Sequence, residues 1–290
     1  MPELATLSQA FVAGARALRR AGLETPELDA RLLLCHAASL SHEAYIARAR
    51  ERLHADAATR FDQAIARRLA CEPVARITGN REFYGRDFIV GPGALDPRPD
   101  TETIIETALD LIAGKGWQEK PLKLLDLGTG TGCILVTLLA ELPYAHGLGT
   151  DLSAEALTFA AANARRHCVS GRAQFVAGDW FDAVSGKFDL ILSNPPYLTT
   201  EEIAGLAEDV VNYDPQLALD GGGDGLEAYR RIASRVRDFL TADGTFLVEI
   251  GPVQGAAVVK FLAAAGLRCA GSQGIRLDLA GRPRVVVAGS

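Results

Sequence analysis

The sequence lacks the features that would place it in several large classes of protein. It has no apolar run of about 18 residues and no charged-then-apolar leader, so we expect neither a membrane span nor an export signal. The five cysteines are widely spaced, odd in number and form no CxxC pair, which predicts reduced, buried thiols in a cytoplasmic protein. No HExxH pair occurs among the histidines, so no metal site is expected.

The chain changes character along its length. Residues 1–70 contain two glycines and carry apolar residues at helical spacing, which predicts a small helical bundle that Pro73 ends. A short hairpin is expected around Gly85, which lies between aromatic residues. Further on, apolar strands alternate with helices, as a parallel sheet requires. We therefore predict a helical bundle for substrate docking at 1–71, a hairpin linker at 72–96 and an α/β catalytic domain at 97–290.

Two later features extend this prediction. Strands are expected at 244–250, 274–278 and 284–288, with the last two forming an antiparallel pair at the edge of the sheet. The glycine-rich segment 221–225 is either a plain flexible connection or part of a mobile loop near the site. The sequence alone does not decide between these two interpretations.

A glycine-rich turn follows the apolar segment 124–127. The turn is Gly128-Thr129-Gly130-Thr131-Gly132, and a helix is expected from Cys133. Glycine permits a tight turn and a close approach of backbone to a ligand, and the start of a helix presents unpaired N–H groups. The spacing is GxGxG, so a P-loop is excluded and a dinucleotide-binding fold is disfavoured.

Acidic and aromatic residues follow the next two apolar segments. Asp151 lies 19 residues after Gly132, and a carboxylate at about that distance accepts hydrogen bonds from ribose hydroxyls in nucleotide-binding βαβ units. Asp179 and Trp180 follow the segment 174–177, where an acid beside an indole can hold and cover an adenine. Aspartates often only cap helices, and tryptophans often only pack in cores. Their order along the chain favours a ligand site, because each group ends a successive strand.

The most informative residues are Asn194-Pro195-Pro196-Tyr197, which follow the apolar run 190–192. Proline fixes φ and restricts the preceding residue, so we expect an extended Asn194 and carbonyl groups that no helix or ladder uses. A planar NH2 group can then donate to the Asn194 side-chain oxygen and to the Pro195 carbonyl while Tyr197 stacks on its face. This arrangement suits chemistry on an amide or exocyclic amine nitrogen. The alternative interpretation is a Pro-Pro turn that only closes a strand.

Together these residues resemble the S-adenosylmethionine-dependent N5-glutamine methyltransferases of peptide chain release factors, the PrmC/HemK family. The resemblance covers residues 72–250, including 126–134, 178–180 and 194–197. It implies a Rossmann-like α/β methyltransferase sheet with an N-terminal helical bundle and a β-hairpin linker. One departure is Asp96, which stands before Pro-Arg-Pro where the family usually has an apolar residue.

The resemblance also implies a cofactor, a substrate and a set of site residues. The cofactor is S-adenosyl-L-methionine, and the substrate is the glutamine of the Gly-Gly-Gln loop of release factors. The implied cofactor-binding residues are Gly128, Thr129, Gly130, Thr131, Gly132, Asp151, Asp179, Trp180 and Asn194. The implied substrate-binding residues are Asn194, Pro195, Pro196 and Tyr197, of which Asn194, Pro195 and Tyr197 are also expected to act in catalysis.

Charge helps to separate the alternatives. The net charge is −6, and residues 1–70 hold 10 arginines and 8 acids, so the remainder carries −8. An acidic catalytic domain disfavours the main rival, a nucleic-acid amine methyltransferase of the N6-adenine type, and no stable nucleic-acid binding is expected. A nicotinamide-dependent oxidoreductase would leave residues 194–197 without a role. A non-catalytic binding protein on the same fold would bind the cofactor without turnover.

Overall fold

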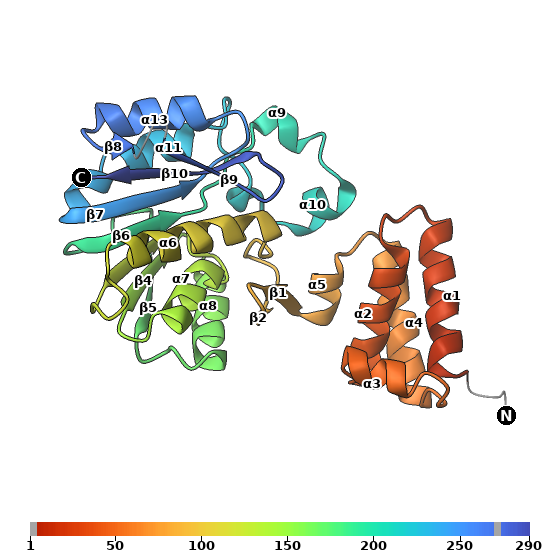
Figure 1. Cartoon of the computed structure of the whole chain (residues 1–290). Coiled ribbons are helices and arrows are strands. Elements are labelled where there is room, and N and C mark those ends of the chain that lie inside the picture. Colours follow the sequence, from red (N-terminus) through yellow and green to blue (C-terminus); the bar gives the residue numbers. More distant parts are fainter. Residues whose placement is uncertain (1–4, 270–273) are drawn as a thin grey trace. The chain divides into compact units, whose positions relative to one another are not determined.

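The computed structural model describes residues 5–269 and 274–290 and divides into two compact units, Met1–Asn80 and Arg81–Ser290 (Figure 1). Across these described ranges, no helix has the length and apolar character needed to cross a membrane. All five cysteines are free thiols. Cys168 is exposed and the other four are half-buried, which corrects the expectation of buried thiols.

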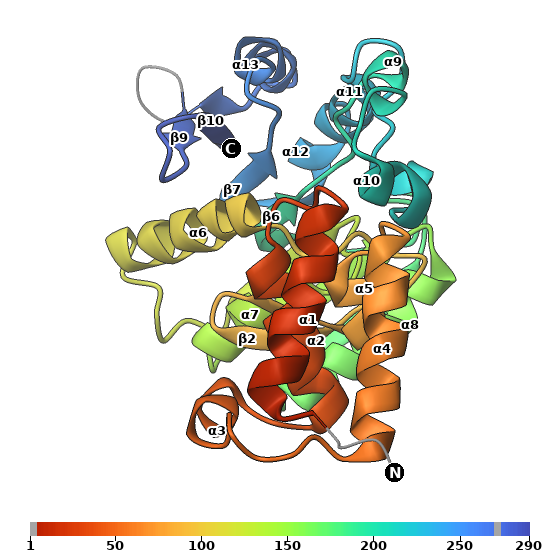
Figure 2. The same cartoon turned by 90° about the vertical axis from the view of Figure 1, so that its right-hand side faces the viewer.

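The first unit is a helical bundle. Its helices are α1 (Leu7–Arg20), α2 (Pro26–Ala38), α3 (His42–Ala47), α4 (Ala55–Leu69) and α5 (Val74–Thr78). Figure 2 shows α1, α2 and α4 side by side, and they enclose a core that includes Leu18, Leu33 and Phe61. Pro73 does not end the bundle as expected but precedes α5, because the first turn of a helix does not need the N–H that proline lacks.

The predicted hairpin is present at the start of the second unit. It consists of β1 (Asn80–Phe83) and β2 (Arg86–Ile89), joined by Tyr84 and Gly85. Both turn residues have positive φ, 52° and 69°, as a tight two-residue hairpin turn requires. The Glu102 carboxylate accepts a hydrogen bond from the Tyr84 N–H at 2.9 Å. The hairpin is thereby tied to the helix that follows it.

The second unit is built on an eight-stranded sheet. Its strands are β3 (Lys123–Leu127), β4 (His146–Asp151), β5 (Ala173–Ala177), β6 (Phe188–Ser193), β7 (Leu240–Glu249), β8 (Arg268–Cys269), β9 (Ile275–Leu277) and β10 (Pro283–Gly289). The order is β5-β4-β3-β6-β7-β10-β8, with β9 also paired to β10. Strands β3 to β7 are parallel, and β10 is antiparallel to its neighbours.

The late strands differ from expectation in one respect. The antiparallel pairing of β9 with β10 is confirmed, but β10 is not at the edge, since it also pairs with β7 and β8. Val285, Val286, Val287 and Ala288 are all buried, and a continuous apolar run of this kind is typical of an inner strand whose two faces are both covered. The two-residue strand β8 has no sequence signal strong enough to predict it.

Helices cover both faces of the sheet (Figure 1). They are η1 (Pro99–Thr101), α6 (Glu102–Gly114), α7 (Cys133–Glu141), α8 (Ala154–Arg166), α9 (Thr200–Ile203), α10 (Glu208–Tyr213), η2 (Gln216–Ala218), α11 (Glu227–Ala233), α12 (Val236–Phe239) and α13 (Gly255–Ala264). Leu124 packs with α6 and α7 in one core, whereas Leu125 packs with α11 and α13 in the other. Successive strand residues thus fill opposite cores, as the period of two requires.

The strand order decides where a ligand can bind. Strand β3 lies between β4 and β6, and the chain leaves β3 through α7 towards β4. The direction of strand order therefore reverses between β3 and β6. In open α/β sheets a crevice forms at such a point, outside the carboxyl ends of the strands. The predicted site residues all lie at or just after the carboxyl ends of β3, β4, β5 or β6.

Candidate active site

The glycine turn connects β3 to α7 in a conformation that other residues rarely adopt. Gly128, Gly130 and Gly132 have φ values of 71°, 55° and 77°. A Cβ on Gly132 would lie 3.1 Å from Ala160 of α8, so this glycine also permits close packing of two helices. The carbonyl of Thr150 accepts hydrogen bonds from the N–H groups of Gly128 and Thr129, which fixes the turn against β4. The turn presents backbone in place of side chains.

A buried carboxyl group lies beneath this turn. Asp126 of β3 is fully buried, and its Oδ2 accepts a hydrogen bond from the Thr129 hydroxyl at 2.6 Å. Burial raises the pKa of Asp126 to about 7, while the bond from Thr129 opposes the rise. This group supports the turn from below.

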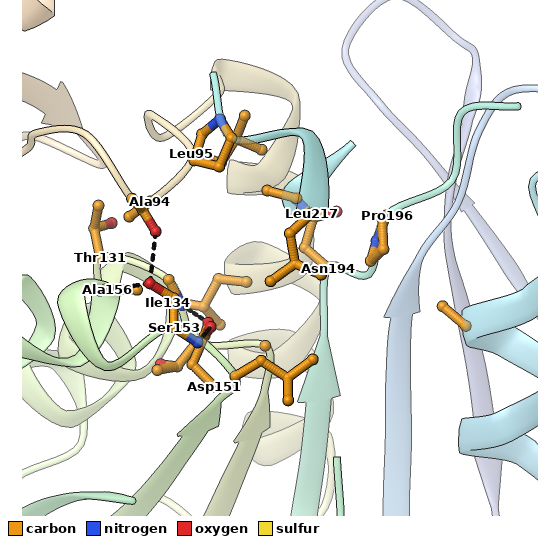
Figure 3. A pocket seen from close by; sticks show the side chains of 18 of the residues that line it. Ala94, Leu95, Thr131, Ile134, Asp151, Ser153, Ala156, Asn194, Pro196 and Leu217 are labelled. Atoms are coloured by element: carbon orange, nitrogen blue, oxygen red, sulfur yellow. Dashed lines mark hydrogen bonds between the residues drawn. The ribbon is translucent and has the colours of Figure 1, made fainter. Parts of the chain in front are cut away.

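Asp151, at the end of β4, links the glycine turn to the next helix. Its Oδ2 accepts a hydrogen bond from Gly130 N at 2.8 Å, and its Oδ1 accepts one from Ser153 N at 2.9 Å. Ser153 in turn donates its hydroxyl to the Gly93 carbonyl at 3.0 Å. Figure 3 shows Asp151, Ser153 and Ala156 along one side of the cavity. A carboxylate has about four lone-pair sites, so Asp151 keeps acceptor capacity for a ligand.

Asp179 and Trp180 follow β5 and close the adenine side of the predicted site. Trp180 has a φ of 52°, and its ring lies 3.5 Å from the position of a Cβ on Gly128. A positive φ in a bulky residue marks local strain that the surrounding structure must support, and such residues cluster at functional sites. Asp179 forms an ion pair with Arg231 of α11 through Oδ2. Its Oδ1 is buried and accepts no hydrogen bond from the described residues.

The tetrapeptide after β6 is held by side chains from distant segments. The Asn194 amide donates through Nδ2 to the Thr101 hydroxyl at 3.1 Å, and Gln254 donates to the Tyr197 carbonyl at 2.8 Å. Neither Asn194 Oδ1 nor the Pro195 carbonyl accepts a hydrogen bond from the described residues. Burial raises the pKa of Tyr197, so the phenol stays neutral. Two acceptors are therefore left available beside an aromatic ring.

A cavity of about 280 Å³ lies over the carboxyl ends of these strands, and we call it the larger cavity (Figure 3). Its lining includes Gly128, Thr129, Gly130, Thr131, Asp151, Asp179, Trp180, Asn194 and Pro196. Gly132 is the one predicted cofactor residue outside this lining, because its role is to begin α7. Carboxylates outnumber cations along the wall, which suits a positively charged ligand.

A second cavity of about 160 Å³, the smaller cavity, meets the larger one at Asn194. Its lining consists of Leu95, Arg98, Asn194, Pro195, Tyr197, Leu198, Leu206, Val210, Ala218, Leu219 and Glu249. The structure therefore brings Asn194, Pro195 and Tyr197 together here and places Pro196 in the larger cavity. The wall is mostly apolar, with the acceptors of Asn194 and Pro195 at the junction.

Several residues at these cavities were not predicted from the sequence. Arg98 lines both cavities and forms an ion pair with Asp214, and Glu249 lines the smaller cavity although only 1% of its surface is exposed. Burial raises the pKa of Glu249 to about 7, and the interaction with the Thr101 side chain opposes the rise. The available signal was an acid that ends an apolar strand, the same signal that identified Asp151. Asp96 is buried and lines the larger cavity.

The glycine-rich segment 221–225 is hydrogen-bonded to the tetrapeptide region. Gly221 N donates to the Leu198 carbonyl at 2.8 Å, and the Gly225 carbonyl accepts from Gln254 at 3.0 Å. A Cβ on Gly225 would lie 2.4 Å from the Tyr197 carbonyl, so glycine is required for this close approach. The segment packs behind residues 194–197, and its neighbours Asp220 and Glu227 line the larger cavity.

A metal site is not apparent in the described part of the chain, where no three His, Cys, Asp or Glu side chains are arranged to hold an ion. The arrangement instead offers a glycine-backed pocket, carboxylate acceptors and a separate apolar cavity that contains two free acceptors. Such a site can hold a cationic nucleotide-like ligand beside a group whose two N–H donors each form a hydrogen bond.

The chain is similar to several known proteins. Residues 9–79 match the family model "PrmC N-terminal domain", and residues 107–224 match "Methyltransferase small domain". A release factor glutamine methyltransferase of Cereibacter sphaeroides is 47% identical over 93% of this chain and 94% of its own length. The corresponding protein of Bradyrhizobium diazoefficiens is 45% identical over 93% and 90%. The solved release factor-specific protein-(glutamine-N5) methyltransferase of Alicyclobacillus acidocaldarius is 27% identical, with a TM-score of 0.39 over 69% of this chain and 98% of its own.

Proposed function

The chain belongs to the release factor glutamine methyltransferase family, and on this premise we propose that it methylates the side-chain amide nitrogen of a glutamine in a release factor, using S-adenosyl-L-methionine. The observation that carries the proposal is the meeting of two cavities at Asn194. The larger cavity takes the methyl donor and the smaller cavity takes the glutamine side chain. Donor and acceptor then meet beside the Asn194 amide.

The residues of the larger cavity fit the proposed cofactor. The glycine turn offers backbone close to the methionine end, and Asp151 retains lone pairs for the ribose hydroxyls. Asp179 Oδ1 is a buried acceptor without a partner among the described residues, and it fits the exocyclic amine of an adenine covered by Trp180. When bound, the cofactor supplies an electrophilic methyl group on a sulfonium centre. The surrounding carboxylates favour that positive charge.

The smaller cavity fits a primary amide that donates both of its hydrogens. In our proposal one N–H points to Asn194 Oδ1 and the other to the Pro195 carbonyl, while Tyr197 lies against the amide plane. A carboxylate would fit less well, because the free polar groups are acceptors and the remaining wall is mostly apolar, with Arg98 and Glu249 as its charged members. Such a cavity selects a neutral NH2 group.

Alignment and exclusion of water are the main tasks of this chain in the reaction. An amide nitrogen is a poor nucleophile, because its lone pair is delocalised into the carbonyl group. The enclosed cavity holds the nitrogen in line with the methyl group and excludes competing water. As the C–N bond forms, the N–H groups become more positive, and the acceptors of Asn194 and Pro195 bind them more strongly than in the ground state. The released proton can leave after bond formation, so no general base is needed at the start.

We further propose that the substrate is a folded release factor presenting its Gly-Gly-Gln loop in the cytoplasm, where release factors act on ribosomes. The first unit has its own apolar core and is proposed to dock the protein substrate. Binding energy obtained away from the reacting centre can then position the loop. Intact release factor should therefore be methylated much faster than a short Gly-Gly-Gln peptide. A variant without residues 1–71 should lose most of that difference, whereas equal rates for both substrates in the full chain would contradict a docking role.

Labelled S-adenosyl-L-methionine and purified release factor test the proposed reaction directly. We expect label on the loop glutamine, located by mass spectrometry, and none on a control release factor whose loop glutamine is replaced by alanine. DNA and RNA are included as competing acceptors. Preferential labelling of nucleic acid would overturn the proposal and favour an exocyclic-amine methyltransferase, although residues 71–290 carry a net charge of −8, which disfavours binding to phosphates.

A further inference from the structure

A chain of polar side chains leads from Asn194 into the protein interior. The Asn194 amide donates to the Thr101 hydroxyl at 3.1 Å, and the Thr101 side chain interacts with the Glu249 carboxyl group, whose pKa it lowers. Thr101 and Glu249 are 2% and 1% exposed, and Glu249 Oε2 is a buried acceptor without a hydrogen-bond partner among the described residues. The three residues come from the end of β6, from η1 and from the end of β7. The contact between residues 194 and 101 spans 93 positions of the chain.

The chemistry of the three groups fixes the direction of the hydrogen bonds. A carboxylate can only accept, and a hydroxyl has a single proton to donate. If Thr101 donates that proton to Glu249, it can only accept from Asn194. It therefore selects the NH2 group of the amide and turns the amide oxygen away from itself, towards the junction of the two cavities.

We propose that Glu249, acting through the Thr101 hydroxyl, is a positioning residue that holds the Asn194 amide oxygen towards the reacting nitrogen. This inference rests on the function proposed above and adds a role for two buried residues outside the tetrapeptide. Without this chain the Asn194 amide can rotate by half a turn and present NH2 to the substrate NH2. Two donors would then face each other, and the acceptor would be lost.

The charge on Glu249 depends on groups from several elements. Those that interact with it electrostatically are Arg284 of β10, Asp100 of η1, Tyr229 of α11, Cys133 of α7 and Tyr197. Burial raises the pKa of Glu249 to about 7, whereas Thr101 and Arg284 oppose the rise. A protonated Glu249 can donate to Thr101 and free the hydroxyl proton to compete for Asn194 Oδ1. Turnover should therefore fall as the pH decreases through about 7.

A matched pair of substitutions tests the positioning role. Thr101→Val keeps the shape of the side chain and removes the hydroxyl, while Thr101→Ser keeps the hydroxyl. With the full chain, release factor and S-adenosyl-L-methionine, we expect Thr101→Val to lower kcat about 10- to 100-fold, since small misplacements of reacting groups have effects of that order. Thr101→Ser should stay within about threefold of the wild type. Cofactor affinity and melting temperature are measured on the same samples.

Two further measurements separate positioning from a structural role. In an Asn194→Ala background, Thr101→Val should lower kcat less than about twofold, because the amide that it orients is absent. In addition, Glu249→Gln, which cannot ionise, should lower kcat and remove the fall in turnover below pH 7. Equal effects of Thr101→Val in both backgrounds, equal loss in the valine and serine variants, or an unchanged pH profile in Glu249→Gln would each overturn the inference. An inactive wild type would instead overturn the proposed function.

Discussion

The walls of the two cavities differ in their residue composition. The wall of the larger cavity contains glycine backbone and several carboxylates, and its shape depends on positive φ values that glycine supplies. The wall of the smaller cavity contains Pro195, the aromatic ring of Tyr197 and aliphatic side chains, together with Arg98 and Glu249. One cavity recognises its ligand mainly by backbone and charge. The other recognises it by shape and by two neutral acceptors.

This difference indicates how specificity is divided. A cationic cofactor gains from the carboxylates of the larger cavity, where Arg98 and Arg231 are each paired with an aspartate and do not oppose it. The smaller cavity holds a neutral amide, so its acceptors must be aimed correctly because no net charge attracts the substrate. We therefore expect substitutions in the smaller cavity to lower turnover and those in the larger cavity to lower cofactor affinity.

The largest effect is predicted for Asn194→Ala, at the junction of both cavities. Loss of an acceptor aimed at the reacting nitrogen should lower turnover about 100- to 1000-fold, as for loss of one preorganised hydrogen-bonding group in an enclosed site. Turnover, cofactor affinity and thermal stability are measured on one preparation. If Asn194 only closes a turn, turnover will follow the folded fraction. Near wild-type methylation of release factor would show that the mechanism is wrong.

A smaller effect is predicted at Asp151 and should appear in binding. Asp151→Ala removes a charged acceptor for the ribose, which should cost about 1.5 to 3 kcal/mol, or about 10- to 100-fold in affinity. The same change also frees Gly130 N and Ser153 N, so Asp151→Asn, which keeps one acceptor oxygen, is the matched control and should lose less. Calorimetry with S-adenosyl-L-methionine checks both variants. Unchanged affinity in a folded Asp151→Ala protein would remove Asp151 from the site.

The sequence predicted the larger cavity better than the smaller one. Glycines, Asp151, Asp179 and Trp180 each follow a strand directly, so one rule about carboxyl ends of parallel strands placed them all. Glu249 also ends a strand, but Thr101 could not be placed in this way, because it reaches Asn194 only after segments 93 residues apart pack together. Local patterns carry no information on such pairings.

The same distinction applies to the fold. Strands β3 to β7 and helix α7 were predicted from their apolar runs and from the glycines that bound them. Among the elements that were not predicted, β8, α9, α10 and α5 contain two to six residues, too few to establish a period. The inner position of β10 depends on its pairing with one of these short strands. Helices α9 and α10 flank Leu206, and Leu206 and Val210 of α10 line the smaller cavity, which is the part of the site least visible in the sequence.

A more moderate effect is predicted for the aromatic wall of the smaller cavity. Tyr197 is proposed to act through its ring face, so Tyr197→Phe should keep most of the activity and Tyr197→Ala should lose about tenfold, the value of one aromatic contact. Steady-state kinetics with release factor should show both changes in turnover and not in cofactor affinity. A large loss in Tyr197→Phe would instead indicate a role for the phenol hydroxyl.

A further effect concerns stability and not turnover, and it is predicted for Asp126, the buried group beneath the glycine turn of the larger cavity. Burial raises the pKa of Asp126 from 3.8 to about 7, so the folded state favours the protonated acid. The stabilisation from this protonation is complete below pH 4 and is lost as the pH rises through about 7, where a buried charge must form.

Asp126→Asn cannot ionise and keeps an oxygen that can accept from the Thr129 hydroxyl, so it should escape this loss. Between pH 5 and pH 8 the free energy of unfolding of the variant should rise relative to the wild type by at most about 3 kcal/mol. The wild type loses about 1.4 kcal/mol for each pH unit between pH 5 and the pKa of about 7, and nothing further above it. The corresponding shift in melting temperature is about 5 °C.

Thermal unfolding of both proteins at pH 5 and at pH 8 checks the sign of this effect. An equal difference in stability between variant and wild type at the two pH values would show that Asp126 does not titrate in this range.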